Sequence, residues 1–321
     1  MRIAKFLLPS IIAVASVNMA VAQPNVAASI KPIHSLVSSV MEGVAVPLLL
    51  VEAGSPHTYS LKPSQAKYLQ EADAIFWVAH DVETFLEKPL DSIPKNTVVV
   101  ELGETEGLVE LSFREGGLFD SHGHDDHDDH DKHDDHDKHD DHAKNDDHGH
   151  SEHDPHFWLD PLNAKVMVRE IQSQLSSMDP VNAARYESNA KKTEARLDEL
   201  VTEIEAELAG LQGRESIALH DAYQYFESRF GDRAIGTITV SPEVMPGAKR
   251  LKELRAKIKK SKATCVFSEP QFEPKVVEVI TSGTSARTGV LDPLGVELKP
   301  GPDLYPTLIK QMAKALKACL S

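Results

Sequence analysis

The chain has 321 residues, of which 41% are hydrophobic and 26% charged, and its formal net charge is −16. At ~100 to 200 residues per domain, this length predicts two lobes, each large enough for its own core. The acidic balance, without a basic face, disfavours nucleic acid as a partner.

The N-terminal residues have the layout of a cleavable secretory signal. Two basic residues precede an apolar run from Phe6 to Val17, and Ala20-Val21-Ala22 offers a cleavage point before Gln23. An uncleaved membrane anchor would need a longer apolar run. No Cys precedes Cys265, which disfavours a lipid anchor. We therefore expect residues 1–22 to be a signal peptide and the mature protein to be soluble and exported.

Short apolar runs alternate with helical patterns up to residue 102. Because the runs lack polar alternation and are separated by helices, they predict a parallel sheet that is buried on both faces. The predicted strands are 25–30, 46–52, 74–79 and 97–102. The predicted helices are one that ends near Met41, one that begins at Ser64 and one near 82–89.

A run of His and Asp follows, and eleven of the sixteen His lie between His122 and His153. Residues 120–154 carry a net charge of −12 and almost no apolar side chains, so we expect a disordered loop. Imidazole and carboxylate groups in this density favour weak, interchangeable binding of transition metals. An inert acidic linker is the alternative. The weak metal ligands would be the residues that recur at every third position, namely His124, His127, His130, His133, His136, His139 and His142.

The segment from Pro180 to Leu211 contains no Pro or Gly until Gly210, and its apolar residues keep helical spacing on one face. At 1.5 Å per residue, such a helix could extend over roughly 45 Å and join both lobes. A stiff helical connector would permit small rocking of the lobes and not a wide hinge.

The alternation of strands and helices then returns. The predicted strands are 216–220, 234–238, 264–269 and 288–293, and the predicted helices end at Phe230, cover 246–260, and begin near Pro274 and at Tyr305. The fold class is therefore α/β, with two lobes that each have a central parallel sheet flanked by helices, joined by one long helix. We expect an N-terminal lobe over 23–178, the linking helix over 179–212 and a C-terminal lobe over 213–321.

Three histidines outside the repetitive run stand at the end of a predicted strand or in the loop after it. They are His57, His156 and His220. Ligands of open α/β sheets bind at the carboxyl ends of strands, so this is where a metal site is expected. For each residue alone the alternative is a histidine without a ligand, namely a loop histidine for His57, the end of the His-rich run for His156 and a core histidine for His220. Asp292, again at a strand end, could supply a carboxylate ligand, or it could simply start a turn before Pro293.

Cys265 and Cys319 are the only two cysteines. In an oxidising compartment such a pair favours a disulfide over a metal site, with two buried free thiols as the alternative.

Six motifs in order make the chain resemble a known family. They are AGSPHTYSLKPS (53–64), DPHFWLDP (154–161), LHDAYQYF (219–226), SPEVMPG (241–247), CVFSEPQF (265–272) and TGVLDPLG (288–295). Together with the His-rich insertion they closely resemble the periplasmic zinc-binding receptors of ABC transporters, the ZnuA type of metal-binding solute receptors. The resemblance covers the chain from about residue 26 to its C-terminus.

The resemblance implies that His57, His156 and His220 hold Zn²⁺ in the cleft between the lobes and that Cys265 bonds Cys319. It implies a monomeric receptor that captures Zn²⁺ and delivers it to a membrane permease with its ATPase. Some relatives have Glu immediately before the first His, where this chain has Pro56. That departure leaves water, Asp292 or a loop histidine as the fourth ligand, and we expect water.

Three neutral imidazoles disfavour Mg²⁺ and Ca²⁺, while Cu²⁺ and Ni²⁺ could compete with Zn²⁺ in vitro. Two other functions fit a His-rich zinc protein. A zinc hydrolase also has three ligands and an open position, but the chain has no His-Glu-x-x-His, no Gly-x-Ser-x-Gly and no obvious general base. We therefore do not expect an enzyme. A metal-storage or surface protein would use the His repeats as its working part.

Overall fold

A computed structural model describes residues 23–115, 119, 153–231, 233–239, 246–260, 263–273 and 275–321. The expected signal peptide, the repeated histidines from His124 to His142 and most of the motif at 241–247 lie outside the described residues. No helix within the described ranges is long and apolar enough to cross a membrane.

The first lobe is built on a parallel sheet with the strand order β2-β1-β3-β4. The strands are β1 (Val26–Ala28), β2 (Leu48–Leu49), β3 (Ala74–Trp77) and β4 (Val98–Glu101), and the helices between them are α1 (Lys31–Val40), α2 (Pro63–Gln70) and α3 (Glu87–Asp91). All residues of β1 and β3 are buried, as their unbroken apolar runs predict. The predicted strand 46–52 is reduced to two residues at the sheet edge, where Pro47 has no N–H to donate.

The second lobe repeats this topology, with the strand order β6-β5-β7-β8. Its strands are β5 (Glu215–Ala218), β6 (Arg233–Thr237), β7 (Ala263–Ser268) and β8 (Arg287–Val290), and its helices are α6 (Gln224–Phe230), α7 (Ala248–Lys260), α8 (Lys275–Thr281) and α9 (Leu304–Leu320). All the pairings in both sheets are parallel. The expected α/β fold with two parallel sheets is therefore confirmed.

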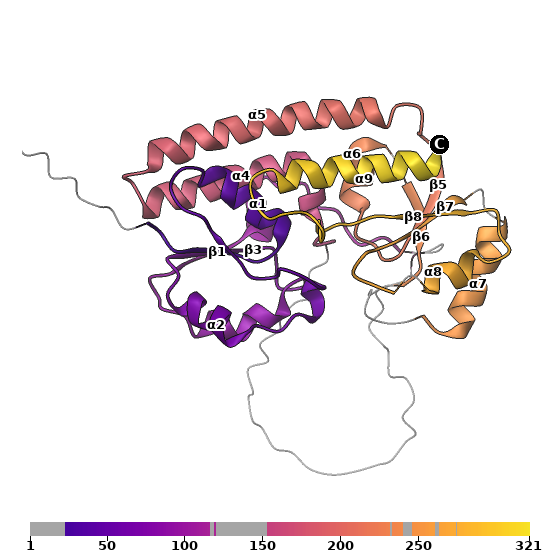
Figure 1. The fold of residues 1–321 in the computed structure, drawn as a ribbon, viewed down its shortest axis with the longest axis horizontal. Helices are drawn as coiled ribbons and strands as arrows, with labels where there is room; N and C mark the ends of the chain where they lie inside the picture. The colour runs from indigo at the N-terminus through magenta and orange to yellow at the C-terminus, as the bar shows by residue number, and fades with distance from the viewer. Residues whose placement is uncertain are drawn as a thin grey trace, which may run out of the picture.

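Two long helices, α4 (Pro161–Met178) and α5 (Ala183–Glu207), pack side by side, and α5 extends along both lobes whereas α4 lies over the first (Figure 1). The structure begins the linking helix at Ala183, whereas the sequence predicts a start at Pro180. The reason is a turn in which Asn182 N donates to Asp179 O at 3.1 Å and Tyr186 Oη donates to the Asp179 carboxylate at 2.8 Å. The 25 residues of α5 span about 37 Å, less than expected.

The C-terminal helix α9 runs back beneath α5 and packs against α1 as well as α5 (Figure 1). One hydrophobic cluster continues from the first sheet through α1, α4, α5 and α9 into the second sheet. The two lobes thus share a hydrophobic core along α1, α4, α5 and α9. A shared core of this kind should permit little movement of one lobe relative to the other.

A disulfide between Cys265 of β7 and Cys319 of α9 ties this helix to the second sheet, as predicted. Gly289 of β8 makes the close packing possible, because a Cβ at this position would lie 2.6 Å from the Phe267 ring and 3.3 Å from Cys319 Sγ. Both cysteines are buried.

Candidate metal centre

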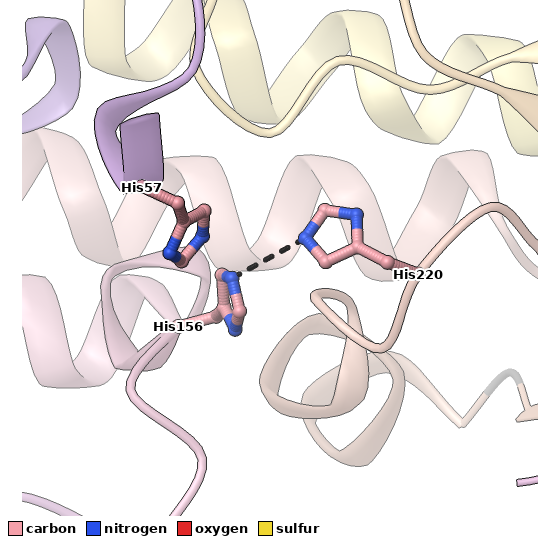
Figure 2. Close-up of side chains that lie close together, drawn as sticks. All are labelled: His57, His156 and His220. Carbon is pink, nitrogen blue, oxygen red and sulfur yellow. Dashed lines mark hydrogen bonds between the residues drawn. The ribbon is translucent and has the colours of Figure 1, made fainter. Parts of the chain in front are cut away.

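The three predicted histidines come from three separate segments and converge between the lobes (Figure 2). His57 lies in a short 3-10 helix, η1 (Pro56–Thr58), whose first turn is capped by Ser55 Oγ accepting from His57 N at 3.3 Å. His156 precedes a second one, η4 (Phe157–Leu159), and His220 follows β5. His57 is half-buried and the other two are buried.

The imidazoles lie close enough to share one ion. One ring nitrogen from each residue can be chosen so that all three atoms lie within 4.8 Å of one another. His156 Nε2 and His220 Nε2 are 3.4 Å apart, the contact drawn dashed in Figure 2. Two ligands of a tetrahedral zinc ion at about 2.0–2.1 Å from the metal would lie about 3.3 Å apart, so this spacing already suits zinc.

A carboxylate holds the other nitrogen of each buried ring. His156 Nδ1 is 2.7 Å from Asp154 Oδ1, which also accepts from His156 N at 3.0 Å. His220 Nδ1 is 2.6 Å from Glu269 Oε1. Asp154 and Glu269 are each 2% exposed, so both carboxylates are shielded from bulk solvent.

These contacts fix the tautomer of each neutral imidazole. A carboxylate accepts a hydrogen bond, so Nδ1 of His156 and of His220 must carry the proton, and each Nε2 then has only a lone pair to offer. Two lone pairs 3.4 Å apart repel each other unless a cation or a proton lies between them. The site is therefore arranged as two oriented metal donors, with His57 completing the group.

A small cavity faces the three rings. Its walls are Ser55, Pro56, His57, His156, Trp158, His220, Glu269, Gln271, Phe272, Pro293 and Leu294. The indole of Trp158 packs against the His156 ring at 5.1 Å between centroids and is held by Nε1 donating to Pro293 O at 3.0 Å. Apolar walls around the nitrogen donors lower the local dielectric and limit access of competing water.

Asp292 is not part of the histidine group that the described residues form. Its carboxylate accepts from the backbone N–H groups of the turn after it, Leu294 at 3.0 Å, Gly295 at 2.9 Å and Val296 at 2.7 Å. It also accepts from Gln271 Nε2 at 3.2 Å. The carboxylate therefore shapes the turn, as the alternative interpretation of Asp-Pro allows.

Gln271 is a site residue that sequence reasoning missed. Its Nε2 is held by Asp292, and its Oε1 is buried in the cavity wall with no hydrogen-bond partner among the residues that the structure describes. A buried acceptor of this kind is costly unless a ligand or water satisfies it. Asp154 and Glu269 were missed as well, although Glu269 is the last residue of a predicted strand, at the sheet edge where ligands bind.

The other histidines among the described residues lie apart from the site. His34 is buried, and its Nε2 is 3.0 Å from Pro47 O. Burial lowers the pKa of His34, so the ring is neutral at pH 7. The half-exposed His80 lies 2.9 Å from Glu87, and the half-exposed His153 lies 3.7 Å from Glu110.

Comparisons with known proteins agree with the fold and with zinc as the ligand. The profile of the family described as "Zinc-uptake complex component A periplasmic" matches residues 26–319. The chain is 54% identical over 313 residues to the high-affinity zinc uptake system protein ZnuA of Brucella suis biovar 1, covering 95% of this chain and 94% of the relative. It is 34% identical to the protein of the same name from Yersinia pestis, covering 92% and 91%.

The fold matches solved structures over almost the whole chain. A crystal structure of ZnuA superposes with a TM-score of 0.74 at 26% identity and covers 94% of this chain and 100% of that one. A manganese complex of the receptor FpvC from Pseudomonas aeruginosa, at 19% identity and a TM-score of 0.74, shares the fold. The chain therefore belongs to the ZnuA family of periplasmic zinc-uptake components.

Proposed function

We propose that this protein is the periplasmic receptor of a zinc importer, which binds one Zn²⁺ tightly through His57, His156 and His220 and releases it to an ABC permease. The observation that carries the proposal is the 3.4 Å distance between His156 Nε2 and His220 Nε2, the two metal-binding atoms. A buried carboxylate at the Nδ1 of each ring fixes its orientation. Membership of a zinc-uptake family supports zinc as the cargo and a permease with its ATPase as the partners. The receptor would act as a monomer and without catalysis.

The donor set supports zinc over the common hard cations. Imidazole nitrogen suits Zn²⁺, whereas Mg²⁺ and Ca²⁺ prefer oxygen ligands. The two buried carboxylates contribute negative charge without occupying the metal, because each accepts from a histidine Nδ1. Their charge offsets the loss of hydration that the cation suffers inside the cleft.

Water is the proposed fourth ligand. Pro56 stands where some relatives carry Glu, and the Asp292 carboxylate is occupied by three backbone N–H groups. Gln271 Oε1 in the cavity wall offers an acceptor for a metal-bound water. An ion held by three protein ligands and one water is also easier to pass on than a fully caged one.

The histidine repeat is proposed as a weak zinc collector for the tight site. The run that contains it lies within the sequence of the N-terminal lobe and ends at His153, three residues before His156, so metal bound there stays near the cleft. Residues 1–22 are proposed to be removed on export, which leaves the mature receptor in the periplasm.

Zinc titration at equilibrium tests the proposal with three proteins. They are the mature chain, a chain that lacks residues 122–152, and the His57→Ala, His156→Ala, His220→Ala triple variant. We expect one tight zinc plus several weak ones in the first, only the tight one in the second and only the weak ones in the third. The triple variant His34→Ala, His80→Ala, His153→Ala is the matched control and should retain the tight site.

Two results would contradict the proposal. Loss of tight binding on deletion of residues 122–152 would place the working site in the repeat and favour a storage protein. An unchanged isotherm for the His57, His156 and His220 triple variant would refute these ligands. Circular dichroism of each variant in the absence of zinc distinguishes loss of ligands from loss of fold.

A further inference from the structure

We propose that Arg114 and Tyr225 are positioning residues that hold the two lobes closed around the zinc and set how fast it is released. Both residues act on the two chain segments at the ends of the His-rich run, the stems, which are Leu111–Arg114 and His153–Asp154. Arg114 belongs to the first stem, and Tyr225 of α6 contacts both. This proposal deepens the proposed function and rests on it.

Arg114 joins the first stem to the second lobe through two carboxylates. Its guanidinium donates from Nε to Asp221 Oδ1 at 3.0 Å and to Oδ2 at 3.1 Å, with a further bond from a terminal nitrogen to the same carboxylate. The other terminal nitrogen donates to Glu227 Oε2 at 2.5 Å. The three side chains are only 18%, 11% and 9% exposed, so this is a desolvated ion cluster and not a surface pair.

Tyr225 of α6 ties both stems at one point. Its hydroxyl donates to Asp154 O at 2.8 Å and accepts from Leu111 N at 3.0 Å. Gln224 adds donations from Nε2 to Ser112 O at 3.1 Å and to Asp154 Oδ2 at 3.2 Å. The stems also bond to each other, since Asp154 N donates to Leu111 O at 2.8 Å. The stems and the start of α6 therefore form one hydrogen-bonded unit across the lobes.

This unit reaches the metal ligands at both ends. Asp154, held by Tyr225 and Gln224, is the residue whose other carboxylate oxygen accepts from His156 Nδ1. Asp221, held by Arg114, directly follows His220 in the chain. His156 belongs to the first lobe and His220 to the second, so any opening of the cleft that separates these ligands must also break the bonds of Arg114 and Tyr225.

Loss of the Arg114 ion cluster should change the rate of zinc release more than the rate of zinc binding. Breaking a buried, hydrogen-bonded charge pair by removing one partner mainly raises the dissociation rate, whereas exposed charges mainly alter association. Without Arg114, the carboxylates of Asp221 and Glu227 would face each other in a buried setting, which favours the open form. Arg196 provides a contrast, because its pair with Asp303 is 42% and 82% exposed and should contribute little.

Zinc release from the full mature chain tests the proposal, measured by stopped flow against an excess of a chromogenic chelator. We expect Arg114→Met to release zinc at least roughly tenfold faster than the unmodified protein, with the association rate and the one-zinc stoichiometry of the tight site kept. Arg114→Lys keeps the charge but not the forked geometry and should fall between the two. Arg196→Met is the matched control and should release zinc at the unmodified rate.

Tyr225→Phe removes one hydroxyl from a residue that is 1% exposed and keeps the ring, so it is the second variant should Arg114→Met fail to fold. It should also speed release. A purely structural role would lower the fraction of protein that binds zinc and leave the release rate of the rest unchanged, which would overturn the proposal. The proposal would also be overturned if Arg114→Met and Tyr225→Phe both released zinc at the rate of the unmodified protein. If the unmodified protein has no tight site, the proposed function itself fails.

Discussion

Glu269 Oε1 lies 2.6 Å from His220 Nδ1, and the two residues follow neighbouring parallel strands, β7 and β5. The register that pairs Ile217 with Val266 brings the ends of the strands together and the carboxylate under the imidazole. Residues that orient a metal-bound histidine in this way usually affect affinity almost as much as the ligand does.

Substitution of Glu269 should therefore weaken the tight zinc site without adding or removing a ligand. We expect Glu269→Gln to raise the dissociation constant by about 10-fold to 100-fold, because an amide can still accept from Nδ1 but supplies no charge. Glu269→Ala should be weaker still. Competition titration against a zinc chelator measures the effect.

Glu273→Gln is the matched control, since this carboxylate lies in the same segment but its side chain is 77% exposed. It should bind zinc as the unmodified chain does. Equal affinities for Glu269→Gln, Glu269→Ala and the unmodified protein would show that the hydrogen bond to His220 has no influence on the metal.

The strands, the helices and the three histidines could be predicted from the sequence because each prediction uses only neighbouring residues in the chain. Unbroken apolar runs such as Ala74–Trp77 have one stable arrangement, in a sheet covered on both faces. The side chains that support the histidines depend instead on contacts between distant segments, such as Glu269 with His220, 49 residues apart. A carboxylate at a strand end looks the same in sequence whether it binds metal, orients an imidazole or shapes a turn, as Asp292 does.

Gln271→Leu should weaken zinc binding several-fold if its Oε1 accepts from a metal-bound water. The substitution keeps the approximate size of the side chain and removes the buried acceptor, at a cost near that of one hydrogen bond, about 1 kcal/mol. Gln311→Leu, on the exposed side of α9, is the control. The visible spectrum of the cobalt-loaded protein should change only for Gln271→Leu, and an identical spectrum and affinity would remove Gln271 from the site.

Removal of the disulfide with Cys265→Ala and Cys319→Ala should lower the free energy of unfolding. The bridge closes a loop with a sequence separation of 54, for which the chain-entropy estimate is about 4 kcal/mol. Urea unfolding of the zinc-free protein measures the loss. Reductant should destabilise the unmodified protein to a similar extent and leave the double variant unchanged; a double variant as stable as the oxidised protein would contradict the prediction.

Glu83 should make the zinc-free protein less stable as the pH rises through neutrality. The side chain is fully buried, and burial raises the pKa of Glu83 to about 8, against opposing hydrogen bonds from the backbone N–H groups of Ala79 and Val78. In the unfolded chain the same carboxyl has its ordinary pKa of 4.5. Between these two values folding must take up a proton, so this group's contribution is fully present below 4.5 and is lost as the pH rises toward 8.

Glu83→Gln should remove that dependence, because the amide stays neutral and can still accept from Val78 N and Ala79 N. The stability difference between the variant and the unmodified protein should grow by up to about 1.4 kcal/mol per pH unit between pH 5 and 8 and level off above that. Denaturant unfolding at a series of pH values measures it, with Glu71→Gln, an exposed carboxylate, as the control. Parallel stability curves for Glu83→Gln and the unmodified protein would mean that Glu83 is ionised in the fold. Its buried Oε1, which has no hydrogen-bond partner among the described residues, would then need a cation or a donor.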